Sequence, residues 1–363
     1  MRPQTNTAIS NDGPTPLHNE GQTVAAGIYG AEAIEAACRW VCPTEDLRRD
    51  LVRAMLRDFM VGCEVRAPLP AGPRLFASNH QVASDVGYFA ALMSGLSRQL
   101  CDIVTWDAHY DLDSSQINRA LYTYPDGPER TVASTVRQRM VNQQEPRDMV
   151  GVARAIGRRL NEEDHAFACV CVHGETDRHE GQEMRGIGAP FLDLALENAI
   201  PITPARFNWG LPDEPEGRLM WSKNLAPLYF VTGASIEPSD LTGLSRVAQR
   251  TVVADAINAL AVPRPEGHFE AARPREDRVR WLATNAGMGL TKAILCDGLF
   301  TTPPELLTEE GRKFLYLASV PGAGDSERAG GFVYRLCRWL SDGFGSSRIP
   351  GLLDVYPNLQ AVS

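Results

Sequence analysis

The sequence predicts an α/β fold: a central, mostly parallel sheet flanked by helices, with a helical C-terminal region. Short apolar runs alternate with amphipathic stretches between residues 74 and 207. After about residue 235 the strand signals fade, and only helical periodicity continues. Because strands that alternate with helices are joined by crossovers, they favour a parallel sheet whose two faces are covered by the helices.

The individual elements follow from the spacing of apolar residues and from the breaks in it. The stretch from about 28 to 60 reads as helical, most clearly in "DLRRDLVRAMLRDFM" (46–60). Strands are predicted at 74–79, 101–106, 166–172 and 200–207. Helices are predicted at 84–100, 149–162 and 190–199, and after 235 at 244–262, 275–295, 304–320 and 330–344. The polar stretch between 107 and 147 is interpreted as an insertion or a lid.

Composition places this chain of 363 residues among ordinary globular proteins. Hydrophobic residues make up 44% of it and charged residues 22%, a balance that supports a sizeable core. The formal net charge of −9 argues against a general nucleic-acid binder, which carries a basic excess. The eight cysteines are scattered and form no CxxC pair, so we expect reduced thiols and a cytoplasmic protein.

The chain is expected to divide into three parts. Residues 1–24, rich in Asn, Thr, Pro and Gly, predict a disordered arm without the apolar core of a signal peptide. An α/β domain that begins with helices is predicted over 25–235, and a helical C-terminal region over 236–363. The longest apolar runs are too short for a membrane span, so the protein is expected to be soluble, with a peripheral membrane contact left open.

The stretch "LFASNHQVASD" (75–85) places His80 where a strand ends and Asp85 where a helix begins. Catalytic groups in α/β sheets tend to lie at the carboxyl ends of strands. A carboxylate that accepts a hydrogen bond from one imidazole nitrogen leaves the other nitrogen to act as a base. His80, oriented by Asp85, would then take a proton from a hydroxyl or amine that attacks an acyl group. The alternative is structural: Ser84 or Asp85 caps the helix, and His80 is an ordinary loop residue.

Two blocks of the sequence together resemble the glycerolipid acyltransferases, the family of the glycerol-3-phosphate and lysophosphatidic acid acyltransferases. "NHQVASD" (79–85) resembles the family's asparagine-histidine-(four residues)-aspartate motif. "HGETDR" (173–178) stands where the family has a proline-glutamate-glycine-threonine-arginine-like loop, and "IPITPARF" (200–207) where it has its last strand. The order and spacing agree over roughly residues 70 to 210.

The resemblance implies an acyltransferase in which His80 is the general base and Asp85 its orienting partner. It implies acyl-CoA or an acyl carrier protein as the donor, hence as a substrate and partner, with no separate cofactor. The implied substrate-binding residues are Asn79, Ser84, His173, Gly174, Glu175, Thr176 and Arg178. The sequence departs from the family at Asp177, where a carboxylate would repel a phosphate. That departure argues against glycerol phosphate as the acceptor.

Other functions stay open beside acyl transfer. The same fold would serve as a non-catalytic module that binds an acyl chain or lipid, although binding alone does not require the His80–Asp85 pair. A thioesterase or esterase would use the pair to activate water, and an added acceptor distinguishes it from a transferase. Cys169, Cys171 and His173 alternate on one face of a predicted strand, but no second ligand cluster accompanies them, so no metal site is predicted.

Overall fold

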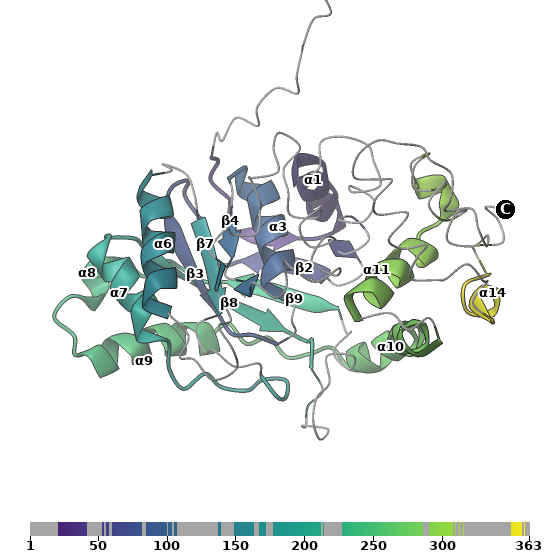
Figure 1. The fold of residues 1–363 in the computed structure, drawn as a ribbon. Coiled ribbons are helices and arrows are strands. Elements are labelled where there is room, and N and C mark those ends of the chain that lie inside the picture. The colour runs from purple at the N-terminus through teal and green to yellow at the C-terminus, as the bar shows by residue number, and fades with distance from the viewer. Residues whose placement is uncertain are drawn as a thin grey trace, which may run out of the picture.

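The computed structural model shows a central sheet with helices on both of its faces (Figure 1). The residues that it describes are 21–41, 53, 56–57, 60–81, 85–99, 101–103, 105–106, 137–138, 149–162, 167–171, 177–211, 213, 227–285, 290–307, 309, 312, 315, 350–357 and 359. Residues 1–20 of the expected arm and the helix expected at 330–344 lie outside this set.

In the described part of the chain, a seven-stranded sheet has the order β1-β2-β9-β8-β3-β7-β4. Its strands are β1 (Gly27–Tyr29), β2 (Met60–Val65), β3 (Arg74–Ser78), β4 (Cys101–Ile103), β7 (Phe167–Cys171), β8 (Ile202–Asn208) and β9 (Leu228–Thr232). The pairs β1–β2 and β8–β9 are antiparallel, and the other neighbouring strands are parallel. The mostly parallel sheet predicted from the sequence is therefore confirmed. A separate small pair joins β5 (Thr105–Trp106) and β6 (Arg137–Gln138).

Two apolar cores lie on opposite faces of the sheet. On β3, Phe76 contributes to one core, while Leu75 and Ala77 contribute to the other, as the alternation of side chains along a strand requires. The first core also contains side chains of α1 (Ala31–Val41), α3 (Asp85–Ser97), α10 (His268–Asn285) and α11 (Leu290–Thr301). The second contains side chains of α6 (Met149–Glu162), α7 (Ala189–Glu197), α8 (Pro238–Leu241) and α9 (Arg246–Asn258). Two short elements near the C-terminal end are η2 (Pro304–Leu306) and α14 (Leu352–Val355).

The elements predicted from strands alternating with helices are confirmed, whereas the prediction near the N-terminal end missed two strands. Strands β3, β7 and β8 and helices α3, α6 and α7 lie where the sequence predicts them. The helical stretch expected from about 28 to 60 contains α1, but its two ends differ, because residues 27–29 form β1 and Met60 begins β2. Strands β1, β2 and β9 were not predicted at all. Pairing with neighbouring strands, rather than local periodicity, decides the conformation of these strands.

The helices after residue 235 contribute side chains to both apolar cores. Helix α9 shares the second core with α6 and α7, whereas α10 and α11 share the first core with α1 and α3 (Figure 1). The helix expected over 275–295 corresponds to parts of α10 and α11, with 286–289 outside the described residues. Among the described helices, none has both the length and the apolar character needed to cross a bilayer. The division of the chain at residues 24 and 235 stays a prediction.

Helices α1 and α3 approach each other closely at Gly95, and this contact yields a test of the packing. An added Cβ at Gly95 would overlap the backbone of Ala37 on α1, so Gly95→Ala is expected to lower the free energy of unfolding by about 1–3 kcal/mol. Gly157→Ala on α6 is the matched control, because the nearest atom to the added Cβ there is Nδ2 of the Asn198 side chain, at 3.2 Å, and not backbone. Urea denaturation of both variants measures the difference. Equal stability of the two variants would contradict this packing.

Candidate functional site

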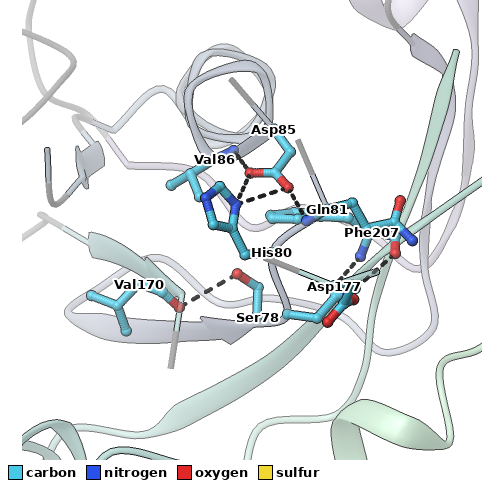
Figure 2. A network of polar contacts seen from close by, with 9 residues as sticks. Ser78, His80, Gln81, Asp85, Val86, Val170, Asp177 and Phe207 are labelled. Carbon is cyan, nitrogen blue, oxygen red and sulfur yellow. Dashed lines mark hydrogen bonds and ion pairs between the residues drawn. The ribbon is translucent and has the colours of Figure 1, made fainter. Parts of the chain in front are cut away.

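His80 and Asp85 lie together at the carboxyl end of β3 (Figure 2). The Nδ1 atom of His80 is 3.0 Å from Oδ1 and 3.2 Å from Oδ2 of the Asp85 carboxylate. The Asp85 side chain is fully buried, whereas the His80 side chain is 25% exposed. The imidazole is thus anchored on its buried side and reaches solvent on the other, as a group that meets a substrate must.

Backbone amides fix the position of the Asp85 carboxylate. Its Oδ2 accepts a hydrogen bond from the Gln81 amide at 2.6 Å, and its Oδ1 accepts one from the Val86 amide at 2.6 Å. Asp85 is the first residue of α3, where the positive end of the helix dipole stabilises a negative charge. The carboxylate therefore caps the helix and holds the histidine at the same time. The structural and catalytic interpretations of Asp85 do not exclude each other.

The aromatic core places the first turn of α3 against the ends of β3 and β8. Phe89 lies one helical turn after Asp85, so both side chains share one side of α3. The Phe89 ring lies 5.2 Å from the Phe76 ring of β3 and 5.7 Å from the Phe207 ring of β8. Phe207 in turn lies 4.9 Å from Phe230 of β9. Packing of these rings therefore sets the distance between Asp85 and the strand end that carries His80.

Asn79 joins three segments beneath His80. Its Nδ2 donates hydrogen bonds to Oδ2 of Asp177 at 2.8 Å and to the carbonyl of Phe207 at 3.0 Å. Its Oδ1 accepts a hydrogen bond from the Phe207 amide at 2.8 Å. The Asp177 amide donates to the carbonyl of His80 at 2.6 Å. The end of β3, the end of β8 and the loop that follows β7 are thereby fastened together at the site (Figure 2).

A second polar connection runs from Gln81 to the same loop. The Gln81 side chain is fully buried and donates from Nε2 to Oε2 of Glu180 at 3.1 Å. The same oxygen of Glu180 accepts a hydrogen bond from the Trp209 amide at 2.9 Å. Both residues that flank His80 are thus held by carboxylates from the segment that follows β7.

Burial shifts the pKa values of the charged groups beneath the site. Removal from water raises the pKa of Glu180, although its hydrogen bonds from Trp209 and Gln81 partly oppose this. The guanidinium of Arg206 on β8 is almost fully buried, and burial lowers its pKa against the opposite pull of Asp177 and Glu180. Arg206 donates to Oδ1 of Asn258 and to a backbone carbonyl, which holds this charge between α9 and the loop. Its positive charge partly compensates the two carboxylates.

This arrangement is suited to moving a proton. When Nδ1 of His80 donates its hydrogen to Asp85, the lone pair of the ring lies on Nε2. Nε2 is on the far side of the ring from Asp85 (Figure 2). A carboxylate that orients the ring also stabilises the imidazolium formed after proton uptake. The geometry is that of a histidine held ready as a general base.

The structure brings together three of the residues predicted for the site: Asn79, His80 and Asp85. The Asn79 side chain makes its hydrogen bonds within the protein, so its predicted contact with substrate stays a prediction. Arg178 is exposed, and its amide donates to Oε1 of Gln182 at 2.9 Å. Ser84, His173, Gly174, Glu175 and Thr176 lie outside the described residues.

Sequence reasoning missed four residues that support the site: Gln81, Asp177, Glu180 and Arg206. From the sequence, Asp177 is expected to repel a phosphate acceptor, but the structure buries its carboxylate against Asn79. Arg206 offers a signal in the sequence, because it is the one charged residue within the predicted strand at 200–207. The described residues contain no group of three or more His, Cys, Asp or Glu side chains arranged to hold a metal.

Comparisons with known proteins leave the family of this chain open. No protein-family model and no curated protein sequence matches it. A solved structure with some similarity is the 1-acyl-sn-glycerophosphate (LPA) acyltransferase PlsC from Thermotoga maritima. The match has a TM-score of 0.38 and 15% sequence identity, and it covers 59% of this chain and 76% of that one. Similarity at this level defines neither a family nor an activity.

Removal of the Asn79 side chain tests the connection beneath His80. Asn79→Ala leaves the buried carboxylate of Asp177 and the backbone groups of Phe207 without these partners. We expect the free energy of unfolding to fall by about 2–4 kcal/mol, measured by urea denaturation. Asn285→Ala is the matched control, since that amide is exposed and bonds within its own helix, and a change within about 0.5 kcal/mol is expected. A similar small effect at Asn79 would contradict the described contacts.

The raised pKa of Glu180 predicts a pH dependence of stability. An acid whose pKa is higher in the folded state than in the unfolded state contributes its full stability below the unfolded pKa. That contribution is lost as the pH rises through the raised pKa of Glu180. Relative to Glu180→Gln, which does not titrate, the wild type should therefore lose stability as the pH rises from the ordinary carboxyl range. Urea denaturation of both proteins across this range is the measurement, and a difference that does not change with pH would contradict it.

Proposed function

We propose that the protein is an acyltransferase that moves an acyl group from a thioester to a hydroxyl group, or less favourably an amine, of an acceptor. The observation that carries the proposal is the contact of His80 Nδ1 with the buried Asp85 carboxylate at the carboxyl end of β3. The sequence resemblance of "NHQVASD" and "HGETDR" to glycerolipid acyltransferases supports the same reaction. The donor in this proposal is acyl-CoA or an acyl carrier protein.

The reaction needs no nucleophile from the protein. Nε2 of His80 takes the proton of the acceptor hydroxyl as its oxygen attacks the carbonyl carbon of the thioester. The tetrahedral intermediate collapses, the carbon–sulfur bond breaks, and the leaving thiolate takes the proton from the imidazolium. The products are an ester and a free thiol. Asp85 keeps Nδ1 protonated throughout and stabilises the imidazolium between the two proton transfers.

The position of Asp177 bears on the acceptor. A carboxylate facing the acceptor would repel a phosphate, but Asp177 is 3% exposed and bonded to Asn79. Because this carboxylate points into the protein, it is not placed to repel an anionic acceptor. Arg178, the next residue, is exposed. We therefore include glycerol 3-phosphate among the acceptors to be tested.

Release of free thiol from a panel of acyl-CoAs and acyl carrier proteins tests this function. We expect the wild type to release thiol faster when an acceptor is present, and His80→Ala to lower that rate by about 10²- to 10⁴-fold. Asp255→Asn, on the exposed side of α9, is the control variant and should keep the wild-type rate. Circular dichroism of each variant shows whether it is folded.

Two results would contradict the proposal. Thiol release that His80→Ala leaves unchanged would remove His80 from the reaction. Thiol release that depends on His80 but shows no rise with any acceptor, and no acylated acceptor by mass spectrometry, would indicate a thioesterase that activates water instead.

A further inference from the structure

Gln81, the residue after His80, is held at both its backbone and its side chain. Its amide donates to Oδ2 of Asp85 at 2.6 Å, which is one of the contacts that fix that carboxylate. Its side-chain Nε2 donates to Glu180 at 3.1 Å, and its Oε1 accepts a hydrogen bond from the Gly210 amide at 3.0 Å. Gln81 thus links the catalytic pair to two segments that are distant in the sequence.

Glu180 is the centre of this link. One of its carboxylate oxygens accepts hydrogen bonds from both the Gln81 side chain and the Trp209 amide. Glu180 is partly buried, and this burial raises the pKa of its carboxyl group. A partly buried carboxylate lowers the stability of the fold unless hydrogen bonds satisfy it. Carboxyl groups with perturbed pKa values are also common at functional sites.

The turn at Trp209 and Gly210 presents two successive backbone amides, which donate to the side chains of Glu180 and Gln81. Trp209 has a φ of +76°, a left-handed conformation that is strained for a bulky residue. Its ring stacks on Tyr229 at 4.4 Å, and its Nε1 donates to the carbonyl of Val262, and these contacts hold the strained backbone. At Gly210, an added Cβ would overlap Cδ2 of Leu228 and lie 2.8 Å from Oε1 of Gln81, so a larger residue would have to displace these side chains. Strain of this kind is maintained where geometry matters to function.

We propose that Glu180 is a positioning residue for the catalytic pair: it fixes Gln81, whose amide fixes Asp85, which orients His80. The expected effect of Glu180 on turnover rests on the proposed acyltransferase function. Its effect on the positions of Gln81 and Asp85 does not. Glu180 acts through Gln81, so its loss should lower turnover and leave substrate affinity unchanged.

Two substitutions separate the hydrogen bonds of Glu180 from its charge. Glu180→Gln keeps an oxygen that accepts from Gln81 and Trp209 but removes the charge, whereas Glu180→Ala removes both. Glu183→Ala is the matched control, because Glu183 is an exposed carboxylate in the same loop. We expect Glu180→Ala to lower kcat for thiol release from an acyl-CoA by about 10- to 100-fold with KM unchanged. Glu180→Gln should lower it much less, and Glu183→Ala should not change it.

Hydrogen exchange of the Gln81 amide, followed by NMR, gives a readout that does not depend on any substrate. We expect exchange at Gln81 to become faster in Glu180→Ala, while the Leu75 amide at the other end of β3, bonded to Pro201, stays protected. A uniform rise at both amides would indicate loss of stability alone and would overturn the proposal. If Glu180→Ala does not fold, Gln81→Ala removes the same link from its other end and should lower kcat in the same way.

The two readouts distinguish the failure of this inference from failure of the proposed function. Faster exchange confined to Gln81, in a protein that transfers no acyl group, would keep Glu180 as a positioning residue and reject acyl transfer. Unchanged exchange at Gln81 in a folded Glu180→Ala variant would overturn the positioning role, whatever reaction the protein catalyses.

Discussion

A buried carboxylate at the first residue of a helix is the constraint on which this site depends. Asp85 is fully excluded from solvent, and a charge in that position costs several kcal/mol unless it is well satisfied. The ring nitrogen of His80 and the amides of Gln81 and Val86 satisfy it. Since two of these partners, His80 and Gln81, are adjacent residues that follow β3, the backbone at these two positions has little freedom to adopt another conformation. The orientation of the imidazole follows from the same requirement.

The constraint extends from the site into the core. Phe89, one turn after Asp85, packs among aromatic rings of β3, β8 and β9. Phe207 contributes its ring to that packing and its backbone to the hydrogen bonds of Asn79. Because one residue serves both purposes, correct packing of the core and correct placement of the strand end beneath His80 are achieved together. The carboxylates that follow β7 then complete the polar side of the same arrangement.

Much of the central fold and the pairing of His80 with Asp85 was predictable from the sequence, since both rest on local signals. The alternation around β3, β7 and β8 is visible in short windows, and His80 and Asp85 are five positions apart. The supporting residues are different. Asp177 and Glu180 contact Asn79 and Gln81, which are 98 and 99 positions away, so only the folded chain brings them together. Strand β9 likewise depends on tertiary contacts, because it forms by antiparallel pairing with β8, the strand that ends just before Trp209.

The tautomer of His80 is the measurement that tests the central claim most directly. In ¹⁵N-labelled wild-type protein, NMR near neutral pH distinguishes a protonated ring nitrogen from an unprotonated one, and comparison with His80→Ala assigns the signals among the seven histidines. The account predicts that Nδ1 carries the hydrogen and donates it to Asp85, while Nε2 is unprotonated and able to accept a proton. A ring protonated at Nε2 with a bare Nδ1 would contradict it, because that tautomer places the hydrogen on the nitrogen that is required to act as the base.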